Sequence, residues 1–253
     1  MQFRDIIGQE EVKQQLRQAV RDGRIPHAQL FTGISGVGKL PLALAYAQYI
    51  ACPNRTDEDS CGTCPTCLQY QKLQHPDLHF AFPIVKGDAG DVCDDFMDKF
   101  RSMILSQPYF DIDDWYRYLG VETKQGMIYE KESGEILRKL SLKSFGDGYK
   151  VMIIWLPEKM HVACANKLLK LLEEPPMKTV FLLISEQPEL LLTTIVSRMQ
   201  EVRVPRLTEA EIAEVLLRDH SDVSPSLAAD IAHMSSGSYL TALKVVDENE
   251  GNS

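Results

Sequence analysis

The residues best suited to chemistry form a loop with the sequence GISGVGKL. Gly33, Gly38 and Lys39 match the phosphate-binding pattern G-x-x-x-x-G-K-[ST], and Gly36 lies between them. Glycines let backbone N–H groups turn towards a phosphate beside a helix N-terminus, and the lysine adds a positive charge. The pattern ends in a hydroxyl residue that holds Mg²⁺, but this position is Leu40. The loop therefore keeps a phosphate cradle and lacks its metal ligand.

Hydrolysis of ATP at such a loop also requires a carboxylate at the tip of a buried strand, to fix Mg²⁺ and orient water. The expected strand covers residues 150–156 and ends in Trp155 and Leu156, which cannot bind a metal ion. Residues 245–248 (VVDE) resemble a strand ending in two acids, but they lie inside a helical pattern. We therefore expect no hydrolysis in cis. The loop then either serves only as a tight turn or retains weak nucleotide or anion binding, and both remain open.

Four of the six cysteines lie in one loop, at residues 52–67, with the spacing C-x8-C-x2-C-x2-C. Four thiolates at these spacings suit a closed, structural tetrahedral zinc site. An iron–sulfur pattern would require a further cysteine where Gln71 stands, and the simplest alternative is four unrelated thiols. The proposed ligands are Cys52, Cys61, Cys64 and Cys67.

Three further residues receive simpler interpretations. Cys93 and Cys164 stand alone in the sequence and are expected to be buried thiols. His75, next to Pro76, is expected in a turn rather than as a substitute metal ligand.

Arg198 follows a helix expected at residues 190–197. An arginine on a rigid terminus can reach the γ-phosphate of ATP bound to a neighbouring subunit, where its planar guanidinium stabilises developing charge. The simpler interpretation is a solvated arginine that pairs with Glu186 or Glu201, and spacing alone favours it.

Composition limits the possible classes of protein. The chain has 253 residues, 44% of them hydrophobic, and a net charge of −9, which argues against nucleic-acid binding dominated by its own surface. No apolar run approaches the roughly 20 residues of a membrane helix, and the N-terminus lacks the apolar core of a secretory signal. A cytoplasmic, reducing location without membrane contact is therefore expected, in which cysteines serve as metal ligands or buried thiols.

Hydrophobic periodicity predicts alternating strands and helices with short connections, which is typical of a parallel sheet sandwiched between helices. The expected strands are 29–32, 78–82, 150–156, 180–184 and 202–204, and the expected helices include 40–51, 128–142, 163–172 and 190–197. We predict an α/β domain at residues 1–205 and a small all-helical domain at 206–253, where Thr208 and Glu211 have capping-box spacing. Residues 86–127 are acidic and aromatic, and we expect an insertion packed on the main domain, in which Asp111 caps a short helix.

The order of these motifs resembles the bacterial clamp-loader AAA+ family. The matching sequences are DIIGQE at 5–10, RIPHA at 24–28, the glycine loop, the four cysteines, HPD at 75–77, NKLLKLLEEPP at 166–176 and Ser197-Arg198. The resemblance covers about residues 1–82 and 128–246. It implies an AAA+ P-loop fold with a helical lid, a structural zinc held by the four cysteines, and an arginine finger, Arg198, that acts on an adjacent motor subunit.

Departures from the family pattern narrow this expectation. Active ATPase subunits carry Thr or Ser in place of Leu40, Asp-Glu-Ala-Asp in place of residues 155–158, and an arginine in place of Thr241. The resemblance therefore implies a non-hydrolysing subunit of the DNA polymerase III holoenzyme, with the motor and delta subunits as partners, and with primed DNA and the sliding clamp contacted through the complex. Met199 replaces the cysteine of the family's Ser-Arg-Cys, which leaves the guanidinium available.

Two alternative functions remain, and two further features depart from the family pattern. The chain could instead be an active clamp-loader ATPase, or a zinc-bearing docking adaptor in which Arg198 has no role. Residues 86–127 have no counterpart in the family. The family's C-terminal collar domain is absent after Ser253, from which we expect a truncated, monomeric protein.

Overall fold

The computed structural model describes residues 1–121, 124–144 and 146–251. Its centre is a five-stranded sheet with the order β2-β3-β4-β1-β5, in which every pairing between these strands is parallel. The strands are β1 (Ala28–Thr32), β2 (Leu78–Ala81), β3 (Lys150–Trp155), β4 (Thr179–Ser185) and β5 (Gln200–Arg203). The predicted α/β class with a parallel sheet is confirmed.

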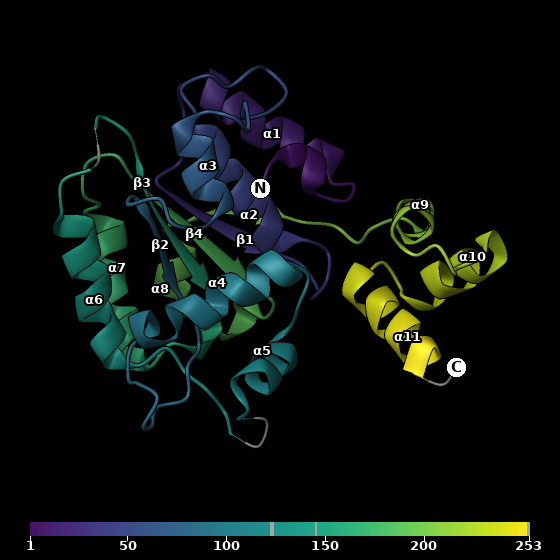
Figure 1. Cartoon of the computed structure of the whole chain (residues 1–253). Coiled ribbons are helices and arrows are strands. Elements are labelled where there is room, and N and C mark those ends of the chain that lie inside the picture. Colours follow the sequence, from purple (N-terminus) through teal and green to yellow (C-terminus); the bar gives the residue numbers. More distant parts are fainter. Residues whose placement is uncertain (122–123, 145, 252–253) are drawn as a thin grey trace.

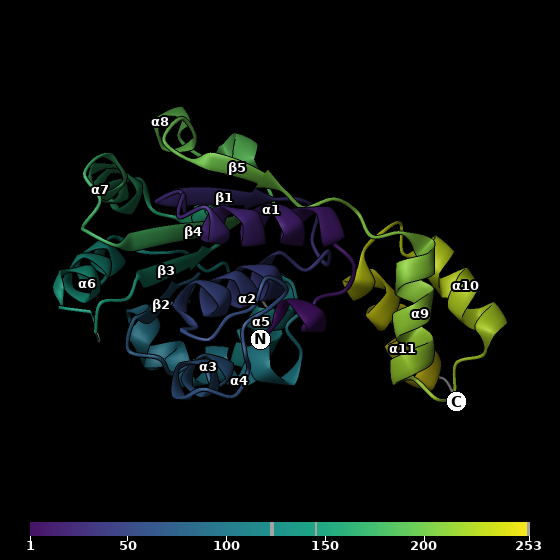
Figure 2. The same cartoon turned by 90° about the horizontal axis from the view of Figure 1, so that it is seen from above.

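Helices lie on both faces of this sheet, as Figures 1 and 2 show. The helices of this part are α1 (Glu10–Arg21), α2 (Lys39–Ala51), α3 (Pro65–Gln71), α4 (Met97–Ser106), α5 (Ile112–Leu119), α6 (Glu130–Ser141), α7 (Val162–Glu173) and α8 (Thr193–Val196). Helices α2, α3 and α4 cover one face, and α7 and α8 lie on the other (Figure 2). Strands β1, β3 and β4 are buried along their whole length because both faces are covered.

The strand order positions the candidate site. Strand β1 lies between β4 and β5, so the direction of the strand order reverses beside it. In open α/β sheets, ligands bind beyond the carboxyl ends of the strands at such a point. The glycine loop begins directly after β1, which places it at this edge.

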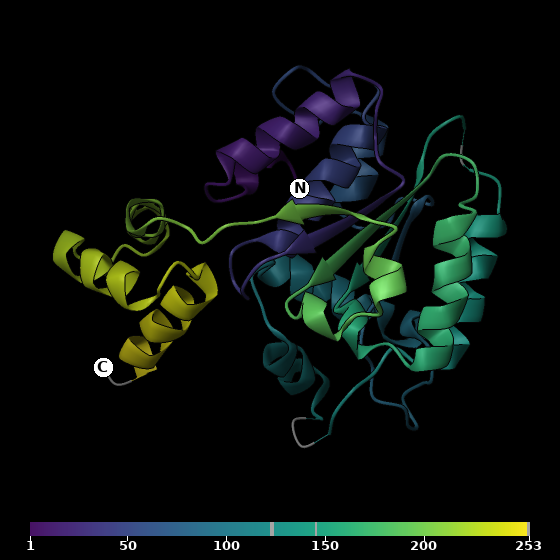
Figure 3. The same cartoon turned by 180° about the vertical axis from the view of Figure 1, so that it is seen from behind.

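Three helices, α9 (Glu209–Asp219), α10 (Pro225–Met234) and α11 (Tyr239–Gly251), form a group beside the sheet, reached by an extended segment after β5 (Figures 1 and 3). We call this group the helical lid. Its hydrophobic cluster also contains Ile7 and Tyr109 from outside the lid. Residues 245–248 lie in α11, so the alternative strand ending in two acids is wrong. At the N-terminus of α9 the Thr208 hydroxyl accepts a hydrogen bond from the Glu211 N–H, at 3.1 Å.

Described residues of the 86–127 segment belong to the hydrophobic core around the sheet. The Phe100 ring stacks on Phe82 at a centroid distance of 3.9 Å and meets the Trp115 edge at 5.2 Å. The Asp111 carboxylate caps α5 by accepting from the Asp114 N–H at 2.9 Å, as expected. The predicted insertion and helical domain also extend over residues 122–123 and 252–253, which lie outside the described residues.

Two predicted elements differ in the structure. The helix expected at 190–197 is reduced to the single turn α8, because Leu191 has an extended backbone conformation and Leu192, with a ψ of 131°, is not helical. The last strand, expected at 202–204, runs from Gln200 to Arg203, so it begins two residues earlier and ends one residue earlier than expected. Among the described residues, no helix has both the length and the apolar character required to cross a membrane.

Candidate phosphate loop, arginine and metal site

The glycine loop connects β1 to α2 in a conformation that requires its glycines. Gly36 and Gly38 have left-handed φ values of 85° and 98°. A Cβ at Gly33 would lie 2.4 Å from the Val204 carbonyl oxygen, and one at Gly36 would lie 2.2 Å from the Ser238 Oγ. Both the backbone conformation and the close approach of neighbouring segments therefore select glycine here.

Lys39 is bound to its own loop. Its Nζ donates to the carbonyl oxygens of Gly33 and Ile34 at 2.8 and 2.6 Å, and the residue is only 5% exposed. Burial lowers the pKa of Lys39 to about 8, although the nearby carboxylates of Glu186 and Glu158 act in the opposite direction. The ammonium group that would hold a phosphate is thus satisfied by loop carbonyls.

The space above the loop is filled by side chains. The cavity beside Gly38 and Lys39 has a volume of about 20 Å³, which is enough for one water molecule. Its walls include Tyr109 and Phe110 from the 86–127 segment, and Trp155 from β3. Phe110 meets the Trp155 ring at a centroid distance of 5.1 Å.

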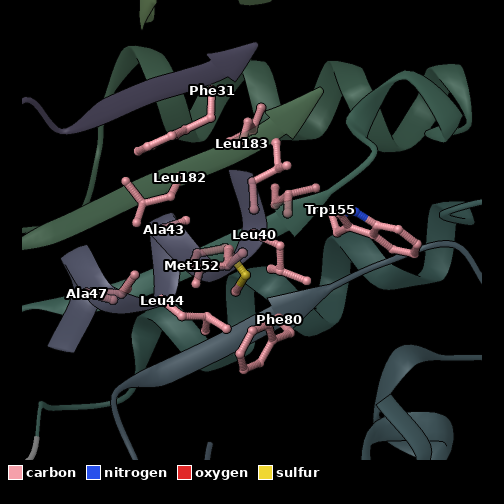
Figure 4. Close-up of a cluster of buried hydrophobic side chains, with 14 of the residues drawn as sticks. Phe31, Leu40, Ala43, Leu44, Ala47, Phe80, Met152, Trp155, Leu182 and Leu183 are labelled. Carbon is pink, nitrogen blue, oxygen red and sulfur yellow. The ribbon is translucent and has the colours of Figure 1, made fainter. Parts of the chain in front are cut away.

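Leu40 and Trp155, the residues that replace metal-binding side chains, belong to the core. Figure 4 shows both within one cluster of buried side chains between α2 and the strands. Leu40 is 5% exposed and Trp155 is 3% exposed. Their apolar character is therefore used in packing.

Sequence reasoning missed two acids beside this loop, Glu158 after β3 and Glu186 after β4. Both are close enough to Lys39 to affect its pKa, and burial raises the pKa of Glu186. The Glu158 Oε2 accepts from the backbone N–H groups of Glu186 and Gln187, each at 2.9 Å. Their positions just beyond the ends of two buried strands were the available signal. Glu158 closes the turn after β4, and Glu186 offsets the charge of Lys39.

Arg198 lies just beyond α8 and is paired within the chain. Its Nη2 lies 2.7 Å from the Glu173 Oε1, and its Nη1 donates to the Thr194 carbonyl oxygen at 2.7 Å. The predicted partners of the simpler interpretation are wrong: Glu186 faces Lys39, and Glu201 pairs with Arg203 at 3.3 Å. A partly exposed pair of this kind contributes only about 0–1 kcal/mol.

The structure brings the four predicted cysteines together. The sulfur atoms of Cys52, Cys61, Cys64 and Cys67 all lie within 4.8 Å of one another, and those of Cys61 and Cys67 are 3.8 Å apart. Four sulfurs bound to one zinc ion at about 2.3 Å are about 3.8 Å apart in a tetrahedron. The group therefore fits a single metal ion.

Backbone N–H groups surround these sulfurs. The Cys61 Sγ accepts from the N–H groups of Thr63 and Cys64 at 3.5 and 3.3 Å, which lowers the pKa of Cys61 to about 6. The Cys52 Sγ accepts from the Cys61 N–H at 3.3 Å. Such donors orient metal-binding thiolates and stabilise their charge.

The three remaining candidates have structural positions. Cys93 and Cys164 are buried, as predicted. The His75 Nδ1 accepts from the Asp77 N–H at 3.0 Å and the ring packs on Tyr70, which agrees with the predicted turn role.

Comparison with known proteins places these features in a family. Residues 8–208 match the protein family described as DNA polymerase III, delta subunit. The DNA polymerase III subunit delta' of Bacillus subtilis (strain 168) is 32% identical over 226 residues, which cover 89% of this chain and 56% of that protein. The DNA polymerase III subunit tau/gamma of Haemophilus influenzae is 26% identical over 250 residues, which cover 97% of this chain and 30% of that protein.

A solved structure supports the fold. The RuvB Holliday junction branch migration motor of Thermotoga maritima superposes with a TM-score of 0.54 at 17% identity, over 95% of this chain and 61% of that chain. The chain spans about half the length of the delta' relative from Bacillus subtilis. On the family match and on this identity, the chain belongs to the delta-prime family of DNA polymerase III clamp-loader subunits.

Proposed function

We propose that this chain is a non-hydrolysing clamp-loader subunit that supplies Arg198 to the ATP site of a neighbouring motor subunit. The observation that carries the non-hydrolysing role is the filled phosphate loop. Lys39 binds loop carbonyls, Tyr109 and Phe110 occupy the space above it, and Leu40 lies in the core. A triphosphate with Mg²⁺ has neither room nor a metal-binding side chain on α2 there.

The position of Arg198 supports a role in trans. It lies just beyond the short α8, and its carboxylate partner Glu173 binds through one guanidinium nitrogen. Of the five N–H donors of an arginine, the three observed contacts, to Glu173, Thr194 and Ser197, leave donors for a planar phosphate interaction. Because the pair with Glu173 is weak, a neighbour's triphosphate could replace it at low cost.

In this proposal the cysteine group binds one structural zinc ion. Cys52, Cys61, Cys64 and Cys67 supply four thiolates, so no coordination position remains for catalytic water. The ion would fix the 52–67 loop against the N-terminal residues, because the Asp59 carboxylate in this loop accepts from the N–H groups of Phe3 and Arg4. The proposed partners are the motor and delta subunits, with the sliding clamp and primed DNA reached through the complex.

The test is a reconstituted loader that contains either the wild-type chain or an Arg198 variant. Arg198→Ala should slow hydrolysis at the adjacent motor site by about 10³-fold or more in single-turnover assays, because an arginine finger contributes on this order. Arg198→Lys should restore little of that rate, because lysine lacks the planar fork. Arg203→Ala, which removes an arginine whose side chain is 85% exposed, is the matched control and should leave the rate unchanged.

An active ATPase is the second candidate, favoured by the carboxylates of Glu158 and Glu186 beside Lys39. The purified chain with Mg-ATP and primed DNA distinguishes the two, since measurable turnover would establish the ATPase. Unchanged hydrolysis and clamp loading with Arg198→Ala would instead leave a zinc-bearing docking adaptor.

A further inference from the structure

The segment from residue 107 to residue 114 joins three parts of the molecule at Tyr109. The Tyr109 hydroxyl oxygen accepts from the Ile7 N–H at 3.2 Å, and its ring meets the Tyr239 edge of α11 at 5.1 Å. A Cβ at Gly38 would lie 2.9 Å from the same hydroxyl, so the side chain also lies directly on the phosphate loop. Tyr109 is 5% exposed and belongs to the hydrophobic cluster of the helical lid.

A second connection lies further along the same segment. Lys244 of α11 forms an ion pair with Asp111, the cap of α5, and lies 3.7 Å from the Asp114 carboxylate. Both carboxylates are held in place by backbone hydrogen bonds. The Asp111 carboxylate accepts from the Asp114 N–H, and the Asp114 carboxylate accepts from the Asp111 N–H. The lid is thus tied to α5 by charge as well as to Tyr109 by aromatic packing.

The lid also contacts the phosphate loop directly. The Tyr239 N–H donates to the Gly36 carbonyl oxygen and the Ser238 hydroxyl donates to the Ser35 carbonyl oxygen, both at 2.9 Å. These two hydrogen bonds lie at one end of α11, so by themselves they allow the helix to pivot about that end. The contacts of Tyr109 and Lys244 lie on the side where the 107–114 segment approaches, and they restrict that pivot.

Proteins whose domains close around a ligand use the ligand as the bridge between the two parts. From these contacts we infer that the 107–114 segment takes the place of a bound nucleotide as the fixed link between the phosphate loop and the helical lid. The lid then keeps one orientation without any ligand, and the subunit presents a constant surface to its neighbours. This inference rests on the proposed function, in which the phosphate loop holds no nucleotide and the 107–114 segment can occupy that place.

Hydrogen exchange of the full chain, measured by mass spectrometry without nucleotide, tests the link. Tyr109→Ala should increase exchange of amides in residues 36–39 and 239–246 by about tenfold, the change that loss of one aromatic pair produces, while α7 keeps its wild-type exchange. Tyr118→Ala is the matched control, because this tyrosine lies in α5 beyond the 107–114 segment, stacks on Trp115 and is 48% exposed. Wild-type exchange of α11 in Tyr109→Ala, or an equal increase in Tyr118→Ala, would overturn the inference.

A second variant covers the case in which Tyr109→Ala unfolds the whole protein, which faster exchange in α7 would reveal. Lys244→Met removes only the charged link from a half-exposed side chain. Increased exchange confined to α11 and the first turn of α5 would support the link, and wild-type exchange there would reject it. ATP turnover by the wild-type chain would reject the proposed function without changing the exchange result, so the two failures are distinguishable.

Discussion

Lys39 matches the phosphate-binding pattern in the sequence, but in the structure its charged group binds the loop itself. Its Nζ is held by two carbonyl oxygens of its own loop, and burial lowers its pKa to about 8. A cation in such a position is costly to desolvate, and the carboxylates of Glu186 and Glu158 compensate for part of that cost. At the residue scale, the charge of Lys39 is therefore satisfied by groups of the loop itself and by nearby carboxylates.

The lowered pKa of Lys39 predicts that this residue makes the free energy of unfolding depend on pH. Below pH 8 the side chain is charged in the folded and unfolded chains, and above its ordinary pKa of 10.5 it is neutral in both. Between these values the folded chain binds fewer protons than the unfolded chain, so the free energy of unfolding rises with pH. The wild-type protein should therefore gain up to about 3 kcal/mol in free energy of unfolding relative to Lys39→Met between pH 7 and 10.5.

Urea denaturation of both proteins at a series of pH values measures this difference. Lys167→Met, which changes a lysine with a 55% exposed side chain, is the control and should show no comparable trend. We subtract the free energy of unfolding of Lys39→Met from that of the wild type at each pH. A difference that stays constant or falls between pH 7 and 10.5 would contradict the buried, charged lysine.

At the scale of elements, we expect the 52–67 loop to depend on the proposed metal for its shape. It has no strand or helix before α3 begins at Pro65, and its N–H groups bind cysteine sulfurs instead of a regular hydrogen-bond ladder. The N-terminal segment packs on it, since Gln2 donates to the Ser60 carbonyl oxygen at 2.6 Å. Loss of the ion should therefore loosen both segments together.

The purified protein should contain one zinc ion per chain by elemental analysis. Removing it with a chelator, or by Cys67→Ser, should lower the thermal unfolding midpoint by about 2–4 °C for each kcal/mol of metal-binding energy lost. Proteolysis should then begin in residues 1–5 and 52–67. Cys164→Ala changes a buried cysteine outside the group and should keep the zinc. Four thiols that react freely in protein prepared without chelator would contradict the metal site.

At the scale of the whole molecule, the net charge of −9 limits how strongly this chain can bind DNA. Phosphate neutralisation requires clustered Lys and Arg, and much of the basic charge here is paired with carboxylates of the chain itself. Arg198, Arg138 and Lys139 all have such partners. Contact with primed DNA is therefore expected only in the assembled loader, where other subunits supply the positive surface.

The isolated chain should bind primed DNA more weakly than a Kd of about 10⁻⁴ M at physiological salt. Fluorescence anisotropy with labelled primed DNA measures this, first with the chain alone and then with the reconstituted loader. Lowering the salt is the internal control, because a hidden basic site would strengthen steeply. Micromolar binding by the chain alone would contradict the expectation and reveal a DNA-contacting face of its own.

The amino-acid sequence determined the features that depend on local spacing. Hydrophobic periodicity predicted the parallel sheet and most of its helices, and the cysteine spacing predicted a group that the structure brings together. The glycine loop and the loss of its metal ligand at Leu40 could also be found from sequence alone. The division of the chain at residue 205, like the roles of Arg198 and Lys39, stays a prediction.

The tertiary structure decided which distant side chains meet. Arg198 pairs with Glu173, not with the Glu186 or Glu201 of its simpler interpretation, and no local pattern revealed the acids beside Lys39. The sequence also showed no role for the 86–127 segment, although Tyr109 contacts Ile7 across 102 positions in the chain. Periodicity and motif spacing report on neighbours along the chain, whereas these contacts arise only when packing of the sheet, the insertion and the lid brings remote segments together.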